Sequence, residues 1–263
     1  MNKTALITGA SRGIGFELSK LFAQDSYNLI LIARSKKTLI EIQQDLSKKY
    51  NIKVLIMIKD LSVPNIAFEI FNELRNKQIK VDVLVNNAGI GDFDKFQNQK
   101  ISKISRIMQI NIISLTELTR LFIDEMIEEK EGKILNISSM AAFQAGPYMA
   151  VYYASKAYVQ SFSEAITSEL RGTGVTVTTL CPGPTKSGFQ QEVGSGNSKL
   201  SKFNFLFSSE KVAKSGYKAL QKGKSIKIPG LIYRFLLNTS RILPRKIKIK
   251  IIRKTQELNR GVY

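Results

Sequence analysis

Two residues stand at a spacing suited to proton transfer. Tyr152 and Lys156 are four residues apart in a segment with a helical pattern, so their side chains share one face of a helix. An ammonium group beside a phenol favours the phenolate and lowers a pKa that is ordinarily near ~10. We therefore expect the Tyr152 phenol, assisted by Lys156, to donate a proton to a bound molecule or accept one from it near neutral pH. Ser139, at the end of a predicted strand, could hold the oxygen atom that gains or loses the proton.

The neighbours of these residues are poorer candidates. Tyr153 is followed four residues later by Ala157 rather than by a lysine. Side chains alternate along a strand, so Ser138 faces away from Ser139. We expect Ser138 to pack or to form a structural hydrogen bond.

Composition restricts the chemistry further. The 263 residues include no histidine and one cysteine, Cys181. Catalytic triads that use histidine are excluded, and we expect no metal site, because the usual nitrogen and sulfur ligands are missing. A single cysteine cannot form an internal disulfide, so the fold does not depend on an oxidising compartment.

A glycine-rich turn follows the first predicted strand. The sequence TGASRGIG spans residues 8–15 and leads directly into a helical pattern. Glycine allows tight turns and close approach to a ligand, and a helix N-terminus offers free N–H groups to a pyrophosphate. The loop is a candidate phosphate site, although a tight connection without a ligand is the alternative. The candidate residues are Gly9, Ser11, Arg12, Gly13, Ile14 and Gly15.

The pattern of apolar residues predicts an α/β fold that positions these groups. Helical patterns lie near 13–25, 37–50, 65–78, 101–129 and 152–171. Short β-branched runs predict strands at 3–8, 28–33, 52–58, 82–86, 132–138, 174–181 and 225–228. This alternation predicts right-handed crossovers and a Rossmann-type, doubly wound parallel sheet flanked by helices. No repeat or linker interrupts it, so we expect a single domain over residues 1–263.

The motifs occur in an order that resembles the short-chain dehydrogenase/reductase family. After the glycine loop come Asp60-Leu61, Asn86-Asn87-Ala88-Gly89, Asn111, Ser138-Ser139, Tyr152-x-x-x-Lys156 and Pro182-Gly183. The resemblance covers about residues 3–190. It implies seven strands in the order 3-2-1-4-5-6-7, and hydride transfer between NADP(H) and a carbonyl or secondary alcohol, with Tyr152 as the general acid or base.

The resemblance also implies residue roles. Asn111, Ser139, Tyr152 and Lys156 would form a catalytic tetrad. Within it, Lys156 would also bind the nicotinamide ribose, and Asn111 would support a water that links Lys156 to solvent. The implied cofactor contacts are Asp60 at the adenine, Asn87 at the nicotinamide side, Thr185 at the nicotinamide amide, and Leu61, Ala88, Gly89, Pro182 and Gly183 along the cleft.

The end of the second predicted strand favours NADP over NAD. Dinucleotide folds that prefer NAD place an acid there for the ribose 2′-hydroxyl, whereas a 2′-phosphate needs cations. This chain has Arg34, Ser35 and Lys36, with no acid before Glu41. Arginine suits a phosphate because its planar fork makes two bonds, and family resemblance implies Arg12 as a second cation. The alternative for Arg34 is a solvated surface charge.

The C-terminal third is less regular. By family resemblance we expect a substrate lid over about residues 185–222, with a flexible start at Gly188, Gly194, Gly196 and Asn197. An apolar cluster follows, which is either a substrate entrance or ordinary packing on the sheet. It comprises Phe203, Phe205, Leu206 and Phe207.

A basic extension spans about residues 229–263. Residues 199–263 carry 17 Lys or Arg and two acids, so most of the net charge of +19 is regional. If the extension forms one or two amphipathic helices, Ile247 and Ile251 share one side. Such helices would cover the substrate pocket with a solvated basic face, dock on an anionic membrane, or form a subunit contact. Nothing matches a nucleic-acid-binding motif, so nucleic acid is not an expected partner.

Together these patterns predict an NADPH-dependent oxidoreductase acting on a small carbonyl or alcohol, with apolar or acyl-bearing molecules preferred. The alternatives are a 3-oxoacyl reductase of lipid synthesis and a non-catalytic NADPH-binding sensor or scaffold, which the complete tetrad disfavours. The resemblance implies a homodimer or homotetramer, built partly on the helix after Tyr152. No signal peptide follows Met1, so we expect a cytoplasmic protein, with peripheral contact at the membrane surface as a further option.

Overall fold

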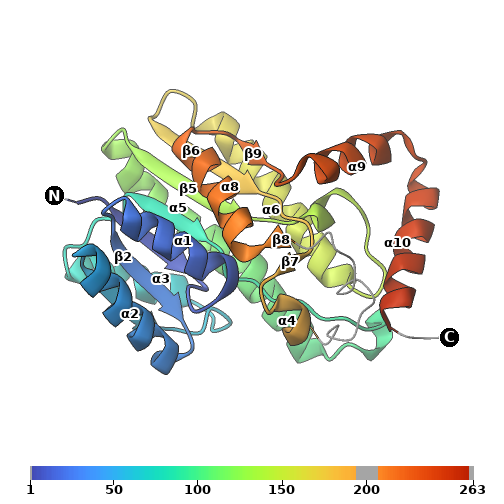
Figure 1. The fold of residues 1–263 in the computed structure, drawn as a ribbon, viewed down its shortest axis with the longest axis horizontal. Coiled ribbons are helices and arrows are strands. Elements are labelled where there is room, and N and C mark those ends of the chain that lie inside the picture. The colour runs from blue at the N-terminus through green and yellow to red at the C-terminus, as the bar shows by residue number, and fades with distance from the viewer. Residues whose placement is uncertain (1, 194–206, 261–263) are drawn as a thin grey trace.

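A parallel sheet of seven strands lies at the centre of the computed structural model, which describes residues 2–193 and 207–260 (Figure 1). The strand order β3-β2-β1-β4-β5-β6-β9 confirms the predicted order, because β9 is the seventh strand of this sheet along the chain. The strands are β1 (Thr4–Thr8), β2 (Asn28–Ala33), β3 (Val54–Ile58), β4 (Val83–Asn86), β5 (Gly132–Ile137), β6 (Val175–Leu180) and β9 (Ile226–Lys227).

Helices cover both faces of the sheet because the strands are apolar on both faces. In β2, Leu29 and Leu31 pack into one core cluster, whereas Ile30 and Ile32 pack into the other. The first cluster is covered by α1 (Gly13–Gln24), α2 (Lys36–Tyr50) and α8 (Ser209–Gln221). The second is covered by α3 (Ile66–Asn76), α5 (Leu115–Glu128) and α6 (Ala150–Glu169).

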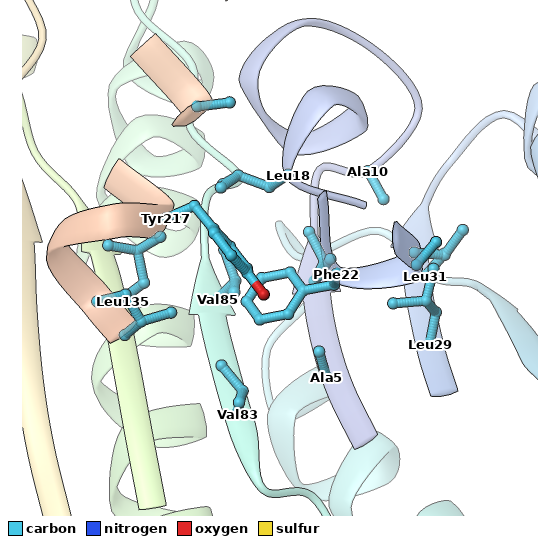
Figure 2. Packing of buried hydrophobic residues seen from close by; sticks show 14 of the residues in the cluster. Ala5, Ala10, Leu18, Phe22, Leu29, Leu31, Val83, Val85, Leu135 and Tyr217 are labelled. Atoms are coloured by element: carbon cyan, nitrogen blue, oxygen red, sulfur yellow. The ribbon is translucent and has the colours of Figure 1, made fainter. Parts of the chain in front are cut away.

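The helix α8 is part of the core. Its Tyr217 meets Phe22 of α1 edge to face, with ring centroids 4.8 Å apart, over Val85 and Leu135 of the sheet (Figure 2). The predicted lid over 185–222 is therefore too long at its C-terminal end. Of the predicted aromatic cluster, Phe203, Phe205 and Leu206 lie outside the described residues, and so do Gly194, Gly196 and Asn197.

The predicted helix over 101–129 is interrupted. It consists of α4 (Ile101–Met108), a π-helical segment (Gln109–Ser114) and α5. Asn111 lies in the π-helical segment, where its side-chain amide donates to the Ile90 carbonyl and to Ser155 Oγ, both at 2.9 Å. Its Oδ1 accepts the Ile90 N–H at 3.0 Å, so Asn111 fixes the loop that follows β4.

Short elements and two amphipathic helices follow β6. The strands β7 (Thr185–Lys186) and β8 (Phe207–Ser208) form a small parallel pair, with α7 (Phe189–Glu192) next to β7 in the chain. The basic extension forms two helices, α9 (Leu231–Ile242) and α10 (Arg245–Arg260), drawn in red at one side of the sheet (Figure 1). No helix within the described ranges is long and apolar enough to cross a membrane.

Candidate active site

A cavity of about 760 Å³ opens at the carboxyl ends of the sheet strands, where ligands bind in doubly wound folds. Most predicted site residues line it. They are Gly9, Ser11, Arg12, Gly13, Ile14, Arg34, Asp60, Leu61, Asn87, Ala88, Gly89, Ser139, Tyr152, Lys156, Pro182, Gly183 and Thr185. Three predicted residues, Gly15, Ser35 and Asn111, are not among its lining residues.

The glycine loop joins β1 to α1 with open N–H groups. Gly9 has φ +65°, a left-handed conformation that favours glycine. Arg12 stands at the N-cap without a side-chain cap, and the first turn of α1 carries no acid. This helix N-terminus is therefore free to bind an anion. Gly15 has a packing role instead, since an added Cβ would lie 2.4 Å from the Gly9 carbonyl oxygen.

Asn87 holds this loop in place. Its Nδ2 donates to the carbonyl oxygens of Thr8 and Gly9, at 2.9 and 3.1 Å. The Thr8 hydroxyl in turn accepts the N–H groups of Asn87 and Ala88, each at 3.0 Å. The side chain predicted to face the nicotinamide is thus engaged with the glycine loop, although Asn87 still lines the cavity.

The polar residues after β2 and β3 have partners of their own. Ser35 pairs with Thr38 Oγ1 at 2.9 Å at the start of α2. Asp60 accepts bonds from the N–H and hydroxyl of Ser62, and its other oxygen accepts from Arg106 at 3.2 Å. Burial opposes ionisation of Asp60, but these hydrogen bonds and the charges of Arg106 and Arg34 together lower its pKa.

Ser139 and Tyr152 meet beside the end of β5. Ser139 caps the short 3-10 turn at Met140–Phe143 by accepting the Ala141 N–H at 3.1 Å, and it also hydrogen-bonds to Tyr152. Tyr152 is partly exposed as a residue, yet its surroundings desolvate the phenol and raise its pKa to about 12, against the effect of Ser139. The expectation that Lys156 lowers the pKa of Tyr152 is therefore wrong for this structure.

The orientation of Lys156 explains that difference. Its Nζ donates to the Ile137 carbonyl at 2.8 Å and lies 5.9 Å from the centroid of the Tyr152 ring. Lys156 is only 5% exposed, and burial lowers its pKa to about 8. Gly89 faces the amine, because a Cβ added there would lie 3.2 Å from Nζ.

The two residues judged poorer candidates have structural partners. Ser138 Oγ donates to the Lys156 carbonyl at 2.8 Å, as expected of a structural hydrogen bond. The Tyr153 hydroxyl accepts from Gln256 Nε2 at 3.0 Å, so Tyr153 attaches α10 to α6. Thr185, predicted to reach the nicotinamide amide, donates to the Gly183 carbonyl at 2.8 Å.

The far wall of the cavity contains residues that the sequence pattern does not mark as site residues. Phe189 of α7 packs on Tyr152, with ring centroids 5.2 Å apart. Glu192 pairs with both Arg12 and Arg34. Nothing in the sequence links an acid to an arginine 180 positions earlier. The apolar spacing within α9 and α10 was a signal for the helix faces that line the cavity. These faces contribute Tyr233, Leu237, Ile251 and Ile252, and Leu243 lines the cavity from the connection between the two helices.

Known proteins share this architecture. The family model for short chain dehydrogenases matches residues 3–198. Ketoacyl reductase HetN from Nostoc sp. is 30% identical over 181 residues, which cover 69% of this chain and 63% of the Nostoc protein. The 3-oxoacyl-[acyl-carrier-protein] reductase FabG from Chlamydia muridarum is 31% identical over 183 residues, covering 70% of this chain and 74% of the relative. The matched region thus spans less than two thirds of the Nostoc relative.

A solved structure shows the same similarity in three dimensions. A short-chain dehydrogenase from Sphingobium yanoikuyae, in complex with NADPH, superposes with a TM-score of 0.81 at 26% sequence identity. The superposition covers 91% of this chain and 93% of that one. At this coverage the superposition extends beyond the part of the chain that the family model matches, residues 3–198.

Proposed function

This chain belongs to the short-chain dehydrogenase family, and from that membership we propose that it is an NADPH-dependent oxidoreductase that reduces a carbonyl group or oxidises the corresponding alcohol. One observation carries the proposal: the cavity that contains the open helix N-terminus also contains Ser139, Tyr152 and Lys156. A binding protein would need the first feature, whereas a proton donor is needed only for a reaction.

The cavity residues fit NADP(H). The glycine loop offers N–H groups to the pyrophosphate, Arg12 and Arg34 offer cations to the 2′-phosphate, and Lys156 offers its amine to the nicotinamide ribose. The NADPH complex of the Sphingobium relative supports this choice. When bound, the nicotinamide supplies or accepts the hydride.

Tyr152 has the protonation state that a proton donor requires. With a pKa of about 12, the phenol keeps its proton at neutral pH. During reduction its O–H bond breaks and the proton passes to the substrate oxygen, which leaves a phenolate. The hydrogen bond from Ser139 stabilises that phenolate. In alcohol oxidation the same groups act in reverse.

The cavity favours an apolar or acyl-bearing substrate. Its outer wall includes Tyr233, Leu237, Ile251 and Ile252. A 3-oxoacyl reductase of lipid synthesis is the second candidate function, and two observations favour it: this apolar wall and the ketoacyl and 3-oxoacyl reductases among the relatives. The alternative of a non-catalytic NADPH sensor is disfavoured by the buried Lys156 and the hydrogen-bonded Ser139–Tyr152 pair.

A carbonyl panel tests this proposal. We expect the protein to oxidise NADPH with at least one class of ketone, and 3-oxoacyl thioesters to exceed small polar ketones. NADPH absorbance gives the rate, and mass spectrometry identifies the alcohol product. Tight NADPH binding without turnover of any carbonyl or alcohol would contradict the enzyme proposal and favour the sensor.

The cofactor preference has its own test. Arg34→Asp places an acid where NAD-binding folds have one, so the preference for NADPH over NADH should fall by about 100-fold. The ratio of kcat/KM for the two cofactors measures this change. Lys48→Asp, near the C-terminal end of α2 and outside the cavity lining, is a matched control for the change in charge. An unchanged ratio in Arg34→Asp would contradict the assignment of Arg34.

We also propose a homodimer or homotetramer that uses α5 and α6. Tyr158 of α6 is exposed and stacks on Phe162, with ring centroids 5.8 Å apart. Exposed Ile113 precedes α5, so apolar surface is available on this side. Light scattering should give a mass of two or four chains, and Tyr158→Lys should reduce it. A monomeric wild type would contradict this proposal.

We further propose that the protein is cytoplasmic and that α9 and α10 contact an anionic membrane surface. Leu231 and Phe235 are 81% and 67% exposed on α9, and residues 245–254 of α10 carry six cations and no acid. Vesicles with anionic lipid should therefore bind the protein more strongly than neutral vesicles. A Leu231→Glu, Phe235→Glu double variant should lose this binding, and equal binding of both proteins would contradict the proposal.

A further inference from the structure

Glu192 lies where the cofactor phosphate is expected. Its carboxylate pairs with the guanidinium of Arg12, and its other oxygen lies 3.5 Å from Arg34. These arginines come from the glycine loop and from the end of β2, which are distant in sequence and share Glu192 as a partner. The Glu192 side chain is 29% exposed, so the pair of contacts lies at the cavity mouth rather than deep inside.

The carboxylate resembles a phosphate in the chemistry that the arginines recognise. Both groups are anions that accept hydrogen bonds from a planar guanidinium. A phosphate monoester carries a charge of about −1.5 to −2 near neutral pH and has three acceptor oxygens, whereas a carboxylate carries −1 and has two. Exposed ion pairs are also individually weak. A 2′-phosphate should therefore displace Glu192 from the arginines.

The same short helix reaches the proposed proton donor. Phe189, three residues before Glu192, packs on the Tyr152 ring, and a Cβ added at Gly91 would lie 3.1 Å from Phe189 and 3.3 Å from Tyr152. Val193, directly after α7, also lies beside Gly91, because the same added Cβ would be 3.3 Å from its side chain. Helix α7 thus touches the phosphate-binding arginines at one end and the substrate side of the cavity at the other.

We infer that Glu192 is a specificity-determining residue that competes with the 2′-phosphate of NADP(H) for Arg12 and Arg34 and is displaced from them when the cofactor binds. Displacing Glu192 moves α7, so Phe189 leaves Tyr152 and the substrate side becomes accessible. A cofactor without the 2′-phosphate does not displace the carboxylate. This inference rests on the proposed binding of NADP(H). It adds that the 2′-phosphate, by displacing Glu192, opens the substrate side of the cavity.

Binding of adenosine 2′,5′-bisphosphate, compared with 5′-AMP, tests the role of Glu192 without turnover. Isothermal titration calorimetry should show that Glu192→Gln tightens binding of the bisphosphate by about fivefold, because the competing carboxylate is gone. Binding of 5′-AMP should change by less than about twofold. Glu210→Gln on α8 is the matched control, since it makes the same charge change at an exposed Glu210–Lys214 pair. It should affect neither ligand.

The outcomes separate this inference from the cofactor proposal. If Arg34→Gln weakens bisphosphate binding while Glu192→Gln leaves it unchanged or weaker, Arg34 binds the phosphate and only the role of Glu192 is refuted. If the wild type binds the bisphosphate no more tightly than 5′-AMP, and Arg34→Gln changes neither affinity, the NADP assignment and this inference fail together. Equal tightening by Glu192→Gln and Glu210→Gln would reveal a general charge effect and would also refute the inference.

A fluorescence experiment tests the movement of α7. The chain contains no tryptophan, so Phe189→Trp introduces a single indole beside Tyr152. Saturating adenosine 2′,5′-bisphosphate should shift its emission, whereas saturating 5′-AMP should not. Adding Glu192→Gln to Phe189→Trp should produce part of that shift before any ligand is present. Emission that stays constant with the bisphosphate would contradict the coupling between the two ends of α7.

Discussion

The two sides of the cavity are built by different kinds of structure. On the side proposed for the cofactor, residues stand at the ends of parallel strands and are held by hydrogen bonds from side chains to the backbone, as Asn87 holds the glycine loop. On the side proposed for the substrate, α10 is attached by hydrogen bonds between side chains, from Gln256 to Tyr153 and from Tyr148 to Glu257. This difference suggests a fixed binding half and an adaptable half, the usual way in which one fold serves many substrates.

The largest effect is expected where the two sides meet, at Tyr152. Tyr152→Phe keeps the ring that Phe189 contacts and removes the proton, so kcat should fall by about 10²- to 10⁴-fold. The Kd of NADPH, measured by titration, should stay within about threefold of the wild type. The matched variant Tyr153→Phe should keep kcat nearly unchanged. Equal losses in both variants would mean that the phenol of Tyr152 has no special role.

On the cofactor side, a single methyl group should destabilise the fold. In Gly15→Ala the new Cβ would lie 2.4 Å from the Gly9 carbonyl and 2.5 Å from Asn87 Nδ2, so the loop must shift. We expect a loss of about 1–3 kcal/mol in the free energy of unfolding, together with weaker NADPH binding. Urea unfolding and cofactor titration measure the two effects. Unchanged stability would show that this side is less rigid than we describe.

The buried Lys156 should make stability depend on pH. Its pKa is about 8 in the folded protein and near 10.5 when unfolded, so between these values the unfolded chain binds more protons and stability rises with pH. Between pH 8 and 9 the wild type should gain about 1 kcal/mol relative to Lys156→Met, whose side chain does not titrate. Parallel curves for the two proteins in urea unfolding would contradict the lowered pKa of Lys156.

On the substrate side, the smallest and most local effect is expected at Gln256. Gln256→Ala removes the hydrogen bond to Tyr153 and should cost about 0.5–1.5 kcal/mol of local stability. Amide exchange should accelerate within α10 and remain unchanged in β1 and β4. KM for a bulky ketone should rise while kcat is retained. Faster exchange across the whole sheet would show that α10 belongs to the same cooperative unit.

The same division explains what the sequence could predict. The glycine loop, Ser139, Tyr152 and Lys156 depend on local spacing at strand ends and on one helix face, and such spacing is readable in one dimension. Glu192 and Phe189 line the cavity from the segment after β6, and their partners Arg12, Arg34 and Tyr152 come from much earlier in the chain. The pKa of Tyr152 also escaped prediction, because spacing shows that an amine is near but not that it turns toward the Ile137 carbonyl.

Helix α8 is a second feature whose role could not be predicted from the sequence. Family resemblance placed a lid over residues 185–222, but Val212, Ala213 and Leu220 are buried on the sheet. Their spacing, which follows one face of a helix, is equally compatible with packing on a core and with covering a pocket. Only the partner surface distinguishes these roles, and that surface includes Phe22, almost 200 residues earlier in the chain.

The central claim is that this cavity transfers a hydride to a carbonyl carbon while Tyr152 supplies the proton. The most direct measurement uses NADPH dideuterated at nicotinamide C4 with an accepted ketone in ordinary water, followed by mass spectrometry of the product. We expect one deuterium on the carbinol carbon and a product hydroxyl whose hydrogen comes from water through Tyr152. A product without deuterium on that carbon would contradict the claim.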